Sequence, residues 1–358
     1  IASYGYIVAS ADHTGNTALD DLLCSRTTGP VTALNRVNDI QAMINAMVDP
    51  TSTEAAGFVA HVDAESIAVT GHSLGGFATF AAVTGYANDL GSVAADGRID
   101  AIIPLAPAIG GDRPPIDPST TTTTDPDRVD RCATPDDPAT PEPTAEEIEA
   151  ARNRKSITDE QLASITVPAM IIVGTDDIAT PVEPNVTRAW EFSNSDPLYR
   201  VELVAGQHQS FSNACRYVEL LPTWSEDLQA LAGPLLISQA AQGCGDGIMD
   251  IQRAQDLTNT FAITFLDSIF RGGEMIDPAT TEIHTSSHTL AVHGALVVAA
   301  RGVATEEGER AADAMEQLER LLVPGPRLRP PSHFVEDLGE VAEHQPLAPD
   351  ETDLGGEP

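Results

Sequence analysis

Basic residues are scarce in this sequence. It holds 19 lysines and arginines against 54 aspartates and glutamates, for a formal net charge of -35, and Lys155 is its sole lysine. A surface this acidic repels nucleic-acid phosphates and the headgroups of anionic lipids. We therefore expect no nucleic-acid partner.

A long apolar run is also lacking. No stretch reaches the roughly 18 apolar residues of a membrane helix, so we predict no membrane span. No signal peptide is visible, but the chain opens at Ile1 rather than at a methionine, inside what reads as a folded element. Any targeting segment would then lie upstream of Ile1.

Cysteine is limited to four residues, and none of them forms a CxxC pair. No cysteine and histidine spacing suits zinc either. We therefore predict no metal site and no cofactor. The four are Cys24, Cys132, Cys215 and Cys244.

Short apolar runs alternate with helical patterns over residues 1–109 and again over 161–275. This alternation is typical of βα units, so we predict an α/β fold with a mostly parallel central sheet and helices on both faces. The expected strands are 6–9, 67–70, 101–105, 168–173 and 201–204. The expected helices are 34–47, 77–83 and 252–270.

Two segments differ from this pattern. Residues 110–160 are rich in threonine, proline and aspartate and poor in large apolar residues, which predicts a mobile surface insertion rather than a folded lid. Residues 276–358 form a carboxy-terminal extension with an apolar stretch at 296–298, a predicted helix at 311–322 and an acidic, proline-rich end that we expect to be disordered. We assign the extension no function.

The strongest motif is Gly-His-Ser-Leu-Gly-Gly at 71–76, between a buried strand and a helix of small residues. A serine at such a junction sits on a sharp turn, and glycines two positions before and after it remove Cβ clashes. The turn would expose the Ser73 hydroxyl and aim the N–H of Leu74 at a developing oxyanion. Ser73 is therefore the candidate nucleophile.

A serine nucleophile needs a base, and nine histidines are available. His72 adjoins the serine, and we expect it to point away as a packing residue. His208 follows the last expected core strand, where loops gather at one edge of a parallel sheet. By elimination and strand order, His208 is the predicted base.

A carboxylate must then follow a strand between the serine and the histidine. Asp176 and Asp177 both follow the strand that ends at Val173, and either could face His208. A buried carboxylate there would accept the Nδ1 proton of the histidine and stabilise the imidazolium. From the residues alone, the choice between the two stays open.

These motifs, in this order, resemble bacterial relatives of the platelet-activating-factor acetylhydrolases and the dienelactone-hydrolase-like esterases, within the α/β-hydrolase superfamily. The resemblance covers roughly residues 1–109 and 161–270 and includes segments 2–9, 12–17, 63–76, 104–107, 174–181 and 206–211. In that family the acid lies three residues after a strand-ending glycine and four before a proline, which selects Asp177. True dienelactone hydrolases use cysteine, so Ser73 argues against that reaction.

The spacing also resembles the secreted cutinase-like polyester hydrolases. Their pocket commonly carries methionine after the serine and an aromatic residue beside the acid, where this chain has Leu74 and Asp176. Short acyl esters are therefore favoured over polyester, with lipid esters also open. The resemblance further implies an oxyanion donor and early strands upstream of Ile1, so we expect the chain to be a fragment of a longer product. One missing donor costs about 10²- to 10³-fold in rate.

Cys215 and Cys244 flank the segment just after His208, where a disulfide would hold that loop. Such a bond implies an oxidising compartment, so we predict a secreted or periplasmic protein. Two buried free thiols remain the alternative. The oligomeric state is not readable.

We favour hydrolysis of a carboxylic ester through an acyl-enzyme on Ser73. A serine peptidase of the same fold is the first alternative, although such enzymes usually carry a propeller or a longer amino-terminal domain. A catalytically silent binding module is the second, because the first oxyanion loop lies outside this chain.

Overall fold

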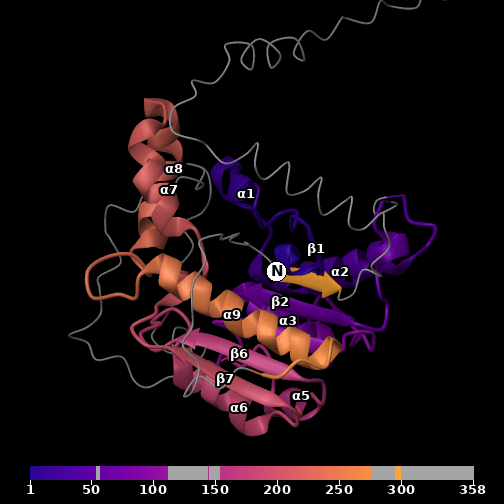
Figure 1. Ribbon diagram of the computed structural model, residues 1–358. Coiled ribbons are helices and arrows are strands. Elements are labelled where there is room, and N and C mark those ends of the chain that lie inside the picture. Colours follow the sequence, from indigo (N-terminus) through magenta and orange to yellow (C-terminus); the bar gives the residue numbers. More distant parts are fainter. Residues whose placement is uncertain (54–56, 112–143, 145–153, 276–294, 300–358) are drawn as a thin grey trace, which may run out of the picture. The chain divides into compact units, whose positions relative to one another are not determined.

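A six-stranded sheet organises the protein. The computed structural model describes residues 1–53, 57–111, 144, 154–275 and 295–299 (Figure 1). In spatial order, the strands are β1 (Ile7–Ser10), β8 (Ala295–Ala299), β2 (Ile67–His72), β5 (Ala101–Leu105), β6 (Ala169–Gly174) and β7 (Leu198–Leu203). A separate hairpin joins β3 (Tyr86–Asn88) to β4 (Gly91–Val93).

The strands β2, β5, β6 and β7 are parallel neighbours, as the βα pattern predicts. Their carboxyl ends therefore share one edge of the sheet, and the loops that follow them meet there. β8 differs, since it pairs antiparallel with both β1 and β2. The apolar stretch at 296–298 thus lies in a strand inside the sheet, which the sequence did not lead us to expect.

Helices lie on both faces of this sheet. They are α1 (Ala18–Leu23), α2 (Gly29–Val48), α3 (Leu74–Thr84), α5 (Asp159–Ala163), α6 (Arg188–Phe192), α7 (Ala214–Leu220), α8 (Glu226–Ala240) and α9 (Ile251–Phe270). Shorter turns are η1 (Ala2–Tyr4), η2 (Val59–His61), the π-helical η3 (Glu183–Thr187), η4 (His208–Phe211) and η5 (Leu221–Thr223).

Alternation along the strands divides the core into two layers. In β6, Ile171 and Val173 face the cluster that includes α2 and α3, whereas Met170 and Ile172 face α9. All four side chains are fully buried. Because successive side chains of a strand point to opposite faces, a strand buried on both faces reads as a continuous apolar run. Replacing one such residue by alanine costs about 2 to 5 kcal/mol.

Most observed boundaries lie within a few residues of the expected ones, although α2 begins five residues before the predicted helix at 34–47. β5 spans the predicted residues, and α9 begins one residue before the predicted helix at 252–270. β7 begins at Leu198 rather than at residue 201, because all six of its residues pair with β6. The predicted helix at 311–322 and the end that we expect to be disordered lie outside the described residues.

The two ends of the predicted insertion lie side by side. Gly110 forms a β-bridge with Lys155, and the N–H of Ser156 donates to the carbonyl of Ile109 at 2.8 Å. Ile157 is already fully buried. The residues on the two sides of the insertion therefore lie together, after the carboxyl end of β5.

Candidate active site

Ser73 occupies a strained turn between β2 and α3. Its φ of 59° and ψ of -114° lie outside the ordinary regions for residues other than glycine. A Cβ on Gly71 would lie 2.6 Å from the backbone of Gly75, so a side chain there cannot be accommodated. The N–H of Ser73 donates to the carbonyl of Leu105 at 2.9 Å, which ties the turn to β5. The motif therefore forms the sharp turn that its glycines predicted.

The three residues predicted to act together lie in hydrogen-bond contact. Ser73 Oγ is 2.9 Å from His208 Nε2, and His208 Nδ1 is 2.9 Å from Asp177 Oδ2. The Asp177 side chain is 0% exposed and that of His208 is 7% exposed. An ionised carboxylate can only accept, so Nδ1 carries the proton and Nε2 can accept the proton of Ser73.

The turn after β6 holds the Asp177 carboxylate in place. Its Oδ1 accepts hydrogen bonds from the N–H groups of Ala179 and Thr180 at 2.9 and 2.7 Å. The hydroxyl of Thr180 donates to Oδ2 at 2.8 Å. These three donors fix the orientation of the carboxylate, so that Oδ2 faces His208 Nδ1.

Asp176 lies in a different environment. It is exposed, and its carboxylate accepts from its neighbour Thr175 through Oγ1 at 2.8 Å. Its own N–H donates to the carbonyl of Gly206 at 2.9 Å. The hydrogen bond with His208 Nδ1 is made by Asp177, the aspartate that the family spacing favoured.

Two glycines let the acid loop and the histidine loop approach each other. A Cβ on Gly174 would lie 2.2 Å from the carbonyl oxygen of Gly206. Gly174 ends β6, and Gly206 precedes the turn that carries His208. The close backbone approach brings the side chains of the two loops within hydrogen-bond reach.

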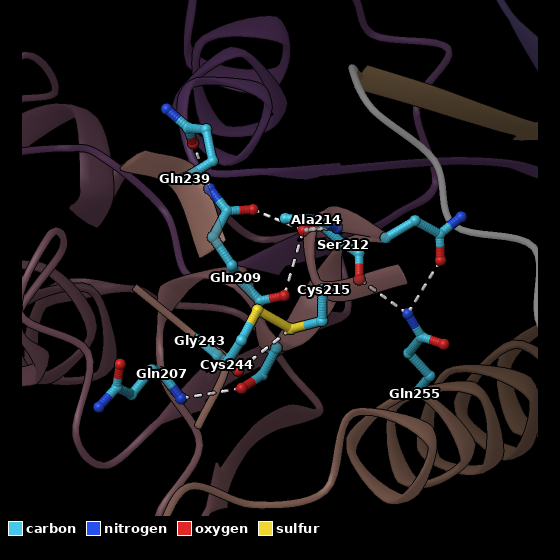
Figure 2. Close-up of a disulfide and its surroundings, with 11 residues drawn as sticks. Gln207, Gln209, Ser212, Ala214, Cys215, Gln239, Gly243, Cys244 and Gln255 are labelled. Atoms are coloured by element: carbon cyan, nitrogen blue, oxygen red, sulfur yellow. Dashed lines mark hydrogen bonds between the residues drawn. A yellow bond between two sulfur atoms is a disulfide. The ribbon is translucent and has the colours of Figure 1, made fainter. Parts of the chain in front are cut away.

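A disulfide closes the segment after His208. Cys215 and Cys244 are bonded, with a sequence separation of 29, as the sequence predicted (Figure 2). The enclosed chain forms the α7–α8 pair. Near the end of this closed loop, the carbonyl of Gln242 accepts a hydrogen bond from the N–H of Gln209 at 2.9 Å, directly beside His208. The closed loop therefore holds the backbone of the residue that follows His208.

Polar side chains add further hydrogen bonds where the disulfide-closed loop meets the turn of His208 (Figure 2). Gln209 donates to the side chain of Gln239 at 2.6 Å and accepts from the hydroxyl of Ser212. Gln255 of α9 donates to the carbonyl of Ser212 at 2.9 Å. The turn carrying His208 is thus tied both to α8 and to α9.

Thr180 is a site residue that we did not predict. Its hydroxyl lies 3.2 Å from His208 Nδ1 as well as 2.8 Å from Asp177 Oδ2. A local signal exists, because an aspartate often accepts from the backbone two and three residues later in a turn. The contact to His208, in contrast, depends on how two distant loops meet.

Leu74 begins α3, as the predicted oxyanion donor should. The first N–H groups of a helix have no partner within it, and the positive end of the helix dipole lies there. The structure therefore places one backbone donor directly after Ser73.

A second buried histidine forms a separate pair. His13 Nδ1 lies 2.7 Å from Asp39 Oδ2, and the His13 side chain is 3% exposed. Burial lowers the pKa of His13, although its hydrogen bond with Asp39 acts in the opposite direction.

Neither a metal cluster nor a membrane helix is seen in the part of the chain that the structure describes. No three histidine, cysteine, aspartate or glutamate side chains there gather as metal ligands. No helix in the same part is both long and apolar enough to cross a bilayer.

The solved structures to which this chain is similar include lipases and esterases. No protein-family model and no curated protein matches the chain. A monoacylglycerol lipase from Paleococcus ferrophilus is 17% identical over 57% of this chain and 75% of its own, with a TM-score of 0.27. A metagenome-derived lipolytic enzyme is 16% identical over 64% and 79%, with a TM-score of 0.32. An esterase domain from Rhodothermus marinus is 16% identical over 64% and 81%, with a TM-score of 0.26.

The fold itself is the α/β-hydrolase fold. Its parallel strands β2, β5, β6 and β7 carry a serine turn, an aspartate turn and a histidine turn at one edge, in that chain order.

Proposed function

We propose that this protein is a serine hydrolase that cleaves carboxylic esters through an acyl-enzyme. One observation carries the proposal: Ser73, His208 and Asp177 form a continuous hydrogen-bonded chain, with 2.9 Å at each of its two links. Chance contacts rarely place a strained serine, a buried histidine and a buried carboxylate in this order at one sheet edge.

In the proposed reaction, Ser73 Oγ attacks the ester carbonyl while His208 Nε2 accepts its proton. The carbonyl oxygen becomes negatively charged and accepts a hydrogen bond from the N–H of Leu74. His208 then gives its proton to the leaving alcohol. A water molecule, deprotonated by His208, attacks the acyl group, and the carboxylic acid leaves as the proton returns to Ser73.

Asp177 would act without changing its own protonation. It holds the Nδ1 proton of His208 and stabilises the imidazolium that forms in each half-reaction. The backbone donors from Ala179 and Thr180 keep its carboxylate in position.

We further propose that esters with short acyl chains are the substrates and that the protein works in an oxidising compartment. The Cys215–Cys244 disulfide supports the second statement, because such bonds persist outside the reducing cytosol. Secretion or a periplasmic site would both fit.

The direct test compares p-nitrophenyl esters of rising acyl length with a peptide anilide. The wild type should hydrolyse the short esters, and Ser73→Ala should abolish that activity. Ser92→Ala, at an exposed position of strand β4, is the matched control and should behave as the wild type. Cleavage of the anilide alone would favour a peptidase, and a folded protein inert toward all of these compounds would favour a silent module.

A further inference from the structure

His72 makes a contact with the catalytic loop that its place in the motif does not require. It ends β2, is half-buried, and its Nε2 lies 2.8 Å from the backbone carbonyl oxygen of His208. A carbonyl oxygen can only accept, so the Nε2 atom of His72 carries a proton and donates it. We had expected this side chain to point away from the site as a packing residue, whereas the structure directs its Nε2 at the loop of His208.

The ring of His72 also packs against the same loop. Its centroid lies 4.6 Å from that of His208, at an interplanar angle of 43°. The ring centroid of Phe211, at the other end of η4, lies 5.7 Å from that of His72. One side chain thus contacts the main chain of His208, its imidazole and the end of its turn.

These contacts add to the hydrogen bond that the N–H of Gln209 donates to the carbonyl of Gln242. The carbonyl of His208 is held by His72, which precedes Ser73 in the chain. Ser73 and His208 are therefore linked in two ways: by the hydrogen bond between their side chains, and by the hydrogen bond from His72 to the carbonyl of His208.

We propose that His72 is a positioning residue that sets the distance between Ser73 and the imidazole of His208. This inference rests on the proposed function, in which that distance governs proton transfer. In this role His72 does not itself transfer a proton. It acts by fixing the backbone from which the His208 side chain extends, and small displacements of a catalytic group reduce rates strongly.

Three substitutions separate the donor from the bulk of the side chain. Glutamine carries its amide near the position of Nε2, whereas asparagine is too short to reach the carbonyl. Leucine fills a comparable volume and donates nothing. We expect His72→Asn and His72→Leu to lower kcat about 10- to 100-fold with KM unchanged, and His72→Gln to restore most of it. His61→Leu, on η2, is the matched control.

The inference fails if His72→Asn keeps the wild-type kcat, or if His72→Gln and His72→Asn are impaired equally. It also fails if only KM changes, because His72 would then contact the substrate. If the leucine variant does not fold, the glutamine and asparagine pair still decides the question.

A second readout is independent of any substrate. The proton on His208 Nδ1, shared with Asp177, gives a strongly downfield NMR resonance when the pair is rigid. His72→Asn should broaden or shift this resonance and His72→Gln should retain it, whereas identical spectra would overturn the inference. This readout applies even to a protein without esterase activity, so the two proposals can fail separately.

Discussion

Replacing Asp177 by asparagine should disable catalysis through the tautomer of His208 rather than through loss of contact. Oδ1 of Asp177 accepts two backbone N–H groups, at 2.9 and 2.7 Å. These donors require an oxygen, so the asparagine carbonyl must take that position. Its NH₂ group then occupies the site of Oδ2, which lies 2.9 Å from His208 Nδ1.

An amide that donates to Nδ1 forces the histidine proton onto Nε2. That nitrogen then has no lone pair for the proton of Ser73, although the packing is almost unchanged. The comparable change in another serine hydrolase lowers kcat about 10⁴-fold, which corresponds to about 5.4 kcal/mol in the activation free energy. We expect a loss of this order for Asp177→Asn.

The matched control is Asp176→Asn, one residue earlier. Its carboxylate is exposed and accepts from Thr175, so we expect a change in kcat of no more than about twofold, in line with an exposed position away from the site. Steady-state hydrolysis of p-nitrophenyl acetate, with thermal melts to verify folding, measures both. Equal activity in the two variants, or a larger loss in Asp176→Asn, would refute the assignment.

Three further predictions concern stability. Replacing Cys215 and Cys244 together by serine should lower the free energy of unfolding by about 3 to 4 kcal/mol, because the bond closes a loop with a sequence separation of 29; a urea midpoint equal to the wild type would contradict this. Gly71→Ala places a Cβ 2.6 Å from backbone and should cost about 1 to 3 kcal/mol in a thermal melt, so an unchanged melt would count against the turn. Burial lowers the pKa of His13, so on acidification this histidine takes up a proton in the unfolded chain before it does so in the folded protein. The stability contributed by the neutral, buried His13 is fully present above about pH 6.5 and is lost as the pH falls. Between about pH 7.5 and 5, wild type should therefore lose more stability than His13→Gln, and parallel curves would exclude this role.

Much of the site followed from local sequence because its parts are built locally. Ser73 lies between a strand and a helix whose patterns are both visible, and the glycines around it have a steric role that needs no distant partner. β5 and β6 are continuous apolar runs because they are buried on both faces. Such features can be predicted from a few neighbouring residues.

The features that we missed depend on contacts between distant segments. β8 pairs with β1 and β2 across most of the chain, and a short apolar stretch alone does not reveal an antiparallel partner. We could choose between Asp176 and Asp177 only from the family resemblance, because the two side chains are identical and the turn after β6 buries one of them. Likewise, the donor from His72 to the carbonyl of His208 appears only when the two loops meet.

The most direct test of the proposed mechanism is covalent labelling with a fluorophosphonate, followed by intact mass measurement and peptide mapping. We predict one equivalent of label, located on Ser73, with strong loss of labelling rate in His208→Ala and none of the label on Ser73→Ala. Label at another residue, or a folded wild-type protein that takes up none, would contradict the assignment of Ser73 as the activated nucleophile.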